Sequence, residues 1–97
     1  MKRNAIGVVE VNFFTNSVVV LDEMLKASDV ELVGFHTLLG GRMVHSIVAG
    51  ETSAVNAAIE AANNAKAIVG ENNVKVAVTI SNPHPEVLKL LNLISNQ

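Results

Sequence analysis

The sequence predicts an α+β fold, with two main helices on one face of a four-stranded antiparallel sheet, from three observations. Its 97 residues are the length of one small domain. Runs rich in Val and Ile alternate with runs of helical periodicity in the order strand, helix, strand, strand, helix, strand. A Gly-Gly pair separates the two middle strands. This βαββαβ order is that of a ferredoxin-like sandwich, and right-handed crossovers place both helices on the same face.

The first half of the chain predicts a strand, a helix and a second strand. Ala5–Phe13 is rich in β-branched residues and is the first strand. Thr15–Ser17 predicts a turn and a helix N-cap, followed by a helix over Val18–Ala27. The second strand is Val30–Leu38. Successive side chains of a strand point to opposite faces. One face of this strand is therefore expected to carry Leu32, Gly34, His36 and Leu38, and the other face Val33, Phe35 and Thr37.

The second half opens with a hairpin turn at Gly40-Gly41 and a third strand over Met43–Val48, closed by Gly50. An alanine-rich helix then runs from Glu51 to about Val69, with Gly70 as its C′ residue. The fourth strand, Val74–Ile80, places four apolar residues on one side, namely Val74, Val76, Val78 and Ile80. Ser81–His84 is a loop, and Pro85 starts a short C-terminal helix over Glu86–Ile94. We expect one domain over residues 1–97, with its core within about 5–91.

Composition excludes several function classes. The chain has three Phe but no Trp or Tyr, which disfavours stacking on nucleic-acid bases. The absence of Cys excludes thiol chemistry and disulfides, and the net charge of −2 lacks the basic character of a nucleic-acid-binding protein. No apolar run approaches the length of a membrane span, and the N-terminus does not read as a signal peptide. No nucleophile motif or paired-carboxylate pattern appears, so we expect no enzyme activity and no cofactor.

Four segments carry a resemblance to a known family. They are Ala5–Glu10, Asp22–Phe35, Val48–Ala58 and Ser81–Val87. In this order and on these elements they resemble the hexameric shell proteins of bacterial microcompartments, in the standard, unpermuted single-domain (BMC-domain) form. The resemblance implies a structural protein that assembles as a cyclic homohexamer with a central pore. Hexamers would tile, with other shell proteins, into a layer that encloses enzymes in the bacterial cytoplasm.

The resemblance also implies site residues. The loop between the second and third strands would line the pore, through Leu38, Leu39, Gly40, Gly41 and Arg42. Lys26 falls on the lysine that meets its counterpart between hexamers, and His84 falls near the same edge. The chain departs from the family in two ways. Asn82 stands where an edge arginine is common, and the pore loop is one residue longer than usual.

Physical reasoning about individual residues leaves alternatives open. Six copies of Arg42 around an axis would favour anions, whereas the plain alternative is a solvated loop arginine.

A two-residue turn pairs position 36 with position 45, so His36 and His45 become cross-strand neighbours. They could hold a metal or respond to pH, or they could be two polar residues beside a subunit contact. Because zinc needs three or four ligands and no further ligand stands near in sequence, we expect no metal site. His84, between two prolines, is expected to help place the last helix.

One alternative function belongs to a different class. The same βαββαβ order occurs in small-molecule-sensing regulatory domains, such as amino-acid-binding ones, in which glycine turns could contribute to a ligand site between subunits. A shell protein is expected to form a ligand-independent hexamer. A regulatory domain is expected to form a dimer or tetramer that responds to a metabolite.

Overall fold

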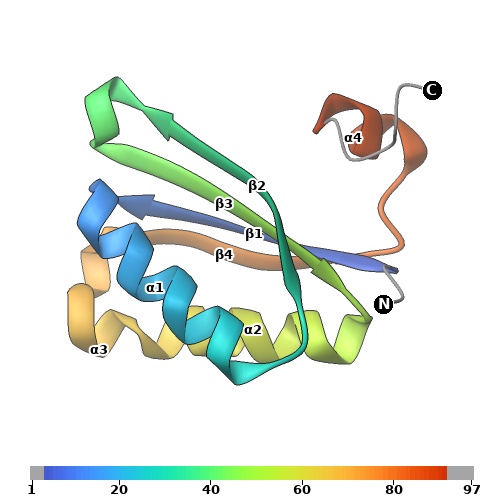
Figure 1. Cartoon of the computed structure of the whole chain (residues 1–97), viewed down its shortest axis with the longest axis horizontal. Helices are drawn as coiled ribbons and strands as arrows, with labels where there is room; N and C mark the ends of the chain where they lie inside the picture. The colour runs from blue at the N-terminus through green and yellow to red at the C-terminus, as the bar shows by residue number, and fades with distance from the viewer. Residues whose placement is uncertain (1–3, 92–97) are drawn as a thin grey trace.

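The computed structural model describes residues 4–91 and contains one antiparallel sheet in the order β2-β3-β1-β4 (Figure 1). The strands are β1 (Ala5–Asn12), β2 (Glu31–Leu38), β3 (Met43–Gly50) and β4 (Val74–Ser81). The two strands that are adjacent in the chain, β2 and β3, form a hairpin, whereas β1 pairs with β3 and β4. This is the strand arrangement of the predicted ferredoxin-like sandwich, and the predicted fold class is confirmed.

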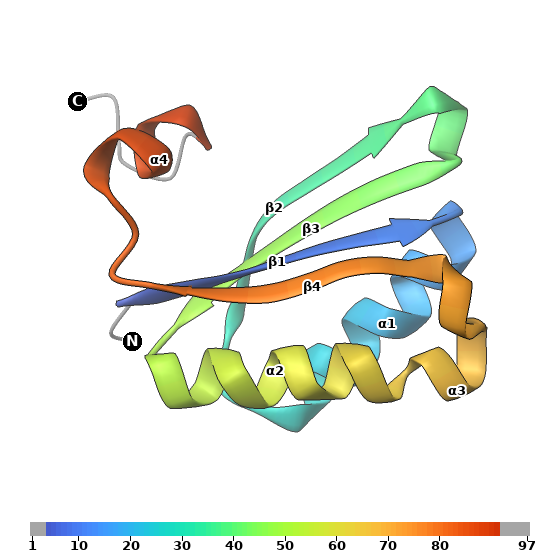
Figure 2. The same cartoon turned by 180° about the vertical axis from the view of Figure 1, so that it is seen from behind.

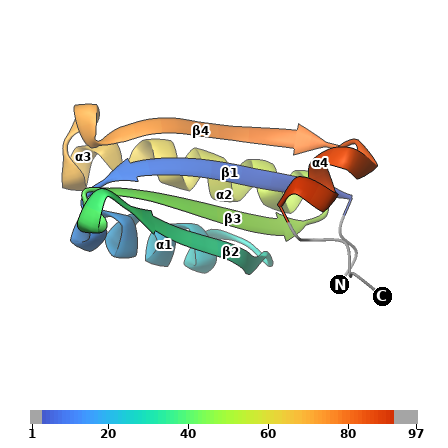
Figure 3. The same cartoon turned by 90° about the horizontal axis from the view of Figure 1, so that it is seen from above.

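The helices divide unequally between the two faces of the sheet. The two main helices, α1 (Phe14–Ala27) and α2 (Thr52–Asn64), lie side by side on one face, as Figures 1 and 3 show. The short α3 (Lys66–Val69) and the 3₁₀ turn η2 (Glu71–Asn73) lead from α2 into β4. The last helix, α4 (Pro85–Leu90), lies on the opposite face at one end of the sheet (Figure 2). Most of that second face therefore carries no helix, and we call it the free face.

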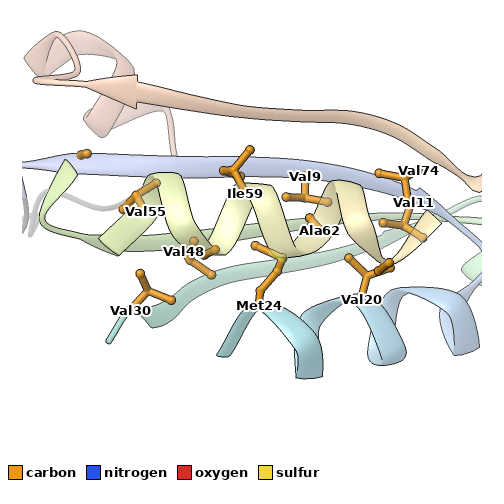
Figure 4. Packing of buried hydrophobic residues seen from close by; sticks show 13 residues of the cluster. Val9, Val11, Val20, Met24, Val30, Val48, Val55, Ile59, Ala62 and Val74 are labelled. Carbon is orange, nitrogen blue, oxygen red and sulfur yellow. The ribbon is translucent and has the colours of Figure 1, made fainter. Parts of the chain in front are cut away.

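The main core fills the space between the sheet and its two covering helices. Valines of β1 and β3 meet α1 and α2 there, with Met24 fully buried at the centre (Figure 4). The alanine-rich face of α2 approaches β1 closely. A Cβ built on Gly7 would lie only 3.0 Å from Ile59 Cδ1 and Val48 Cγ2, so this contact has no room for a side chain.

A second, smaller cluster lies on the free face beneath α4. It consists of Ile6, Ile47 and Ala49, with partly buried Val8, Val33, Leu88 and Leu91 packed against it. Since α4 covers only this end of the sheet, β1 and β3 are buried on both faces there and more open elsewhere.

The first helix begins earlier than predicted. The expected N-cap residues Thr15–Ser17 lie inside the first turn of α1, which starts at Phe14. Their polar side chains bond backwards instead of capping, because Asn16 Nδ2 donates to Asn12 O at 3.1 Å and Ser17 Oγ donates to Phe14 O at 2.6 Å. Phe13, predicted as the end of the strand, has a positive φ of 72° and is the sharp bend between β1 and α1.

Two β-bulges overturn the predicted faces of the outer strands. In β2, Leu32 pairs with Val48 and Gly34 with Ile47, so Val33 is an extra residue. Val33 therefore packs into the cluster on the free face, and the prediction that it shares a face with Phe35 and Thr37 is wrong. In β4, Glu10 pairs with Val76 and Val11 with Val74, so Lys75 is extra.

The bulge at Lys75 splits the predicted apolar stripe of β4. Val74 is 6% exposed and belongs to the main core, whereas Val76 is 42% exposed. Since successive side chains alternate beyond the bulge, Val78 and Ile80 follow Val76 onto the free face. The prediction that all four residues share one side is therefore wrong.

The second main helix is interrupted where one continuous helix was expected. The regular part ends at Asn64, and α3 follows after Ala65. Gly70 ends α3 as its C-cap residue rather than as C′, with a φ of 103° and a ψ of 136°, and its N–H donates to Lys66 O at 2.9 Å. The C-terminal helix begins at Pro85 as predicted and ends at Leu90. The expected continuation over residues 92–94 lies outside the described residues.

Candidate functional site

The hairpin between β2 and β3 is a tight turn with three consecutive left-handed residues. The last ladder pair is Leu38 with Met43, and Arg42 N–H donates to Leu39 O at 3.3 Å across the turn. Gly40 and Gly41 have φ of 67° and 92°, positive values that glycine adopts without steric cost. Leu39 also has a positive φ of 54°, a conformation that a leucine rarely adopts. These three residues form the short turn η1 (Leu39–Gly41), in which the φ/ψ of Gly40 are not helical.

The hairpin is tied to the beginning of α1. Phe13 N–H donates to Arg42 O at 2.9 Å, so a backbone hydrogen bond joins the last residue of the turn to the residue just before α1. The rings of Phe14 and Phe35 meet edge to face at 6.0 Å between centroids. These two contacts hold the turn in one position relative to the sheet, although it extends beyond the helices at the end of the sheet opposite α4 (Figure 1).

The side chains at the tip point outward. Leu39 is 68% exposed, and Leu38 and Arg42 are exposed as well. Among residues 4–91, no ion pair or hydrogen bond engages the guanidinium of Arg42. The tip of the hairpin therefore presents an exposed leucine and, within residues 4–91, an arginine without a partner.

The predicted edge residues lie in separate elements. Lys26 is in the last turn of α1 and is exposed; its Nζ lies 2.7 Å from Oδ2 of Asp22, one turn earlier. The hydrogen bond and charge of Asp22 raise the pKa of Lys26. The lysine therefore keeps its charge, and the ion pair holds its flexible chain near the helix surface.

Asn82 and His84 both shape the passage from β4 into α4. Asn82 has a positive φ of 48°, and its N–H donates to Asn4 O at 2.7 Å. Asparagine tolerates this conformation better than other residues with a side chain. His84 caps α4, because its Nδ1 accepts a hydrogen bond from Glu86 N–H at 3.0 Å. The expectation that His84 helps to place the last helix is confirmed.

The predicted pairing of His36 with His45 is also confirmed, and the structure adds a third member. Glu10 lies opposite His45 on the other side, in β1, and its Oε1 is 3.2 Å from His45 Nε2. Sequence reasoning missed Glu10, because only the register between β1 and β3 brings the two residues together. Within residues 4–91, no group of three His, Cys, Asp or Glu side chains is arranged to hold a metal ion.

None of the helices between residues 4 and 91 combines the length and apolarity that a membrane span requires.

Comparison with known proteins defines the class. The model of the BMC domain matches residues 5–83. The chain is 38% identical over 91 residues to the bacterial microcompartment shell protein PduA of Citrobacter freundii, covering 94% of this chain and 95% of that protein. It is 39% identical over 83 residues to the carboxysome shell protein CsoS1 of Prochlorococcus marinus, covering 86% of this chain and 79% of that protein. The chain belongs to the BMC-domain family, and the resemblance predicted from its four segments is confirmed.

A solved structure of a microcompartment protein has the same fold. The crystal structure of a microcompartment protein from Desulfitobacterium hafniense DCB superimposes with a TM-score of 0.77 at 25% identity. The match covers 96% of this chain and 49% of that one, so this chain spans about half of its length. None of these relatives is named as a metabolite-sensing regulatory domain, the alternative that the strand order alone left open.

Proposed function

We propose that this chain is a structural, non-enzymatic subunit of a bacterial microcompartment shell in the cytoplasm. In this proposal six copies form a ring, with the hairpin Leu38–Arg42 around the common axis and Lys26, Asn82 and His84 at the outer edge. Rings of this chain and of other shell proteins meet edge to edge to form the layer. The enzymes enclosed by that layer are further partners.

The observation that carries the proposal is the match to PduA over nearly the whole of both chains. The shape of the hairpin supports the pore role. A rigid turn presents two adjacent glycines and an exposed Leu39, which allows six copies to approach closely without side-chain clashes at the glycines. The chain is also small, with exposed apolar side chains on the turn and on the free face, and it gains buried surface by self-association.

The assembly state tests the proposal. Size-exclusion chromatography with light scattering is expected to give six times the mass of the chain, 10.3 kDa, without added ligand. Electron microscopy of concentrated protein is expected to show flat layers of these rings. A dimer or tetramer whose size changes on addition of an amino acid would instead support the regulatory alternative, and a monomer at high concentration would overturn both.

A further inference from the structure

A polar network surrounds the first turn of α2, at the end of the sheet away from the hairpin (Figure 1). The helix begins at Thr52, and within residues 4–91 its N-cap residue, Glu51, makes no side-chain capping hydrogen bond. The first N–H groups of a helix have no acceptor inside the helix, so they need one from elsewhere. Here it comes from Asn4, 48 residues earlier in the chain, whose Oδ1 accepts from Thr52 N–H at 2.9 Å.

The hydroxyl of Thr52 extends the network to the end of β4. Thr52 Oγ1 donates to Asn4 Oδ1 at 3.3 Å, and it lies 3.1 Å from the Oγ of Ser81, the last residue of the strand. A hydroxyl has one hydrogen to donate. Since Thr52 gives its hydrogen to Asn4, Ser81 is the donor in the second bond. The bonds therefore run from Ser81 through Thr52 to Asn4, and they need an oxygen acceptor at position 4 but not an amide nitrogen.

The backbone of Asn4 holds the passage from β4 into α4. Its carbonyl oxygen accepts from Asn82 N–H at 2.7 Å, at the residue with the positive φ of 48°. Beyond this passage, α4 packs through Leu88 and Leu91 against the small cluster on the free face. The residue that caps α2 therefore also fixes the point at which the passage leaves the sheet.

The end of α1 is tied to the same turn of α2. Ser28, the C-cap residue of α1, donates from its Oγ to Ala54 O at 2.7 Å. The chain segments also approach closely here, because a Cβ built on Gly50 would lie 3.3 Å from Asp29 O. Ser28 follows Lys26 by two residues. The last turn of α1, which carries Lys26, is therefore fastened to the start of α2.

We propose that Asn4 and Ser28 are positioning residues, which hold the two parts of the outer edge in a fixed relation through the first turn of α2. One part is Lys26, and the other is the passage with the exposed Asn82 and His84. This rests on the proposed function, in which both parts belong to one edge. Surfaces that are ordered before they meet lose less conformational entropy on binding. The network therefore favours layers of rings, although neither positioning residue contacts the adjacent ring.

Hydrogen exchange of the full chain, followed by mass spectrometry, tests the hold on the passage. Asn4→Ala removes the acceptor at position 4, and exchange over residues 82–91 is expected to become about fivefold faster, the effect of one lost hydrogen bond. Asn4→Asp keeps an oxygen acceptor and is expected to stay within about twofold of the natural chain. The matched control is Asn63→Ala, which removes another asparagine bonded to α2, through its Nδ2 to Ile59 O, and is expected to change nothing over residues 82–91.

Layer formation tests the positioning role, because a network that only stabilised the fold would not separate hexamers from layers. Asn4→Ala and Ser28→Ala are each expected to keep hexamers in light scattering. Both are expected to reduce the area of the layers seen by electron microscopy at least about threefold. Asn4→Asp and Asn63→Ala are expected to form layers as the natural chain does.

Four results would overturn this inference. They are full-sized layers in Asn4→Ala and Ser28→Ala, loss of hexamers in these two variants, unchanged exchange over residues 82–91 in Asn4→Ala, and an Asn4→Asp variant that behaves like Asn4→Ala. If the natural chain itself forms no hexamers, the proposed function fails. The exchange rates then decide by themselves whether Asn4 holds the passage.

Discussion

Lys26 and Asp22 form an ion pair on the exposed side of α1, with Nζ 2.7 Å from Oδ2. The two residues are one helical turn apart, the spacing at which an acidic residue supports a later lysine. The pair is solvent-exposed, so its effect on folding stability is small. At the proposed edge its effect would be larger, because Asp22 neutralises a lysine that would otherwise face the lysine of an adjacent hexamer.

The proposed edge role of Lys26 predicts how substitutions at this ion pair affect assembly. Lys26→Asp places two carboxylates one turn apart, and it is expected to leave hexamers intact while abolishing extended layers. Asp22→Asn is expected to reduce layers at low salt, because the lysines then repel each other. Glu23→Gln, at the adjacent acidic position, is the matched control and is expected to keep layers. Light scattering counts subunits and electron microscopy scores layers; layers that persist in Lys26→Asp would contradict the edge role.

The raised pKa of Lys26 predicts a pH range for the charge on this side chain. Asp22 raises the pKa above the ordinary lysine value of 10.5, chiefly by a side-chain hydrogen bond. A group whose pKa is higher in the folded state stabilises that state below its unfolded pKa, and it loses this contribution as pH rises through the folded value. Lys26 is therefore expected to keep its charge through neutral and mildly alkaline solution, up to about pH 9. Titration of a lysine labelled with ¹⁵N at Nζ checks this, and loss of charge at Lys26 below pH 9 would contradict it.

The proposed position of Arg42 at the pore predicts which molecules pass through it. Its guanidinium has no ion pair within residues 4–91 and sits at the end of a fixed turn. Entry of iodide and of neutral acrylamide into closed shells is followed by quenching of an enclosed fluorophore. Arg42→Ala is expected to reduce entry of iodide into shells severalfold while leaving acrylamide entry unchanged, because six positive charges are removed. Arg42→Lys keeps the charge and is expected to behave as the natural chain does. Equal iodide entry in all three proteins would show that Arg42 is only a solvated loop residue.

The bulge at Lys75 predicts unequal costs for two similar valines. Val74→Ala removes methyl groups from the main core and is expected to lower the free energy of unfolding by about 2 kcal/mol. Val76→Ala, two residues later, changes a half-exposed side chain and is expected to cost less than about 0.5 kcal/mol. Denaturant unfolding of dissociated subunits measures both. Equal costs would mean that the two side chains share a face after all.

The backbone of Asn82 predicts a conflict between stability and assembly. Asn82→Gly is expected to leave the unfolding free energy almost unchanged, because glycine also adopts the positive φ of 48°. Asn82→Arg is expected to lower it by about 1 kcal/mol, because a long side chain tolerates this conformation poorly. At the proposed edge, the guanidinium of the same variant offers five N–H donors and is expected to enlarge the layers. A variant that gains stability without enlarging the layers would contradict both parts.

The sequence alone determined the order of the elements, the hairpin and the pairing of His36 with His45. These follow from local properties: β-branched runs, helical periodicity and the turn chemistry of two glycines. It also carried the four segments that place the chain in its family. The start of α1 was predicted wrongly because the side chains of Asn16 and Ser17 donate to the backbone of Asn12 and Phe14. Residues of this kind can either cap a helix or bond to an earlier carbonyl, and the sequence does not distinguish the two.

The tertiary structure alone decided which faces the outer strands present and what completes the histidine pair. Bulges at Val33 and Lys75 arise from pairing between strands that are distant in sequence, and one extra residue moves every later side chain to the other face. For the same reason Glu10, 35 residues before His45, became its partner only through the register of β1 against β3. Periodicity is a local signal, whereas register is set by contacts across the whole fold.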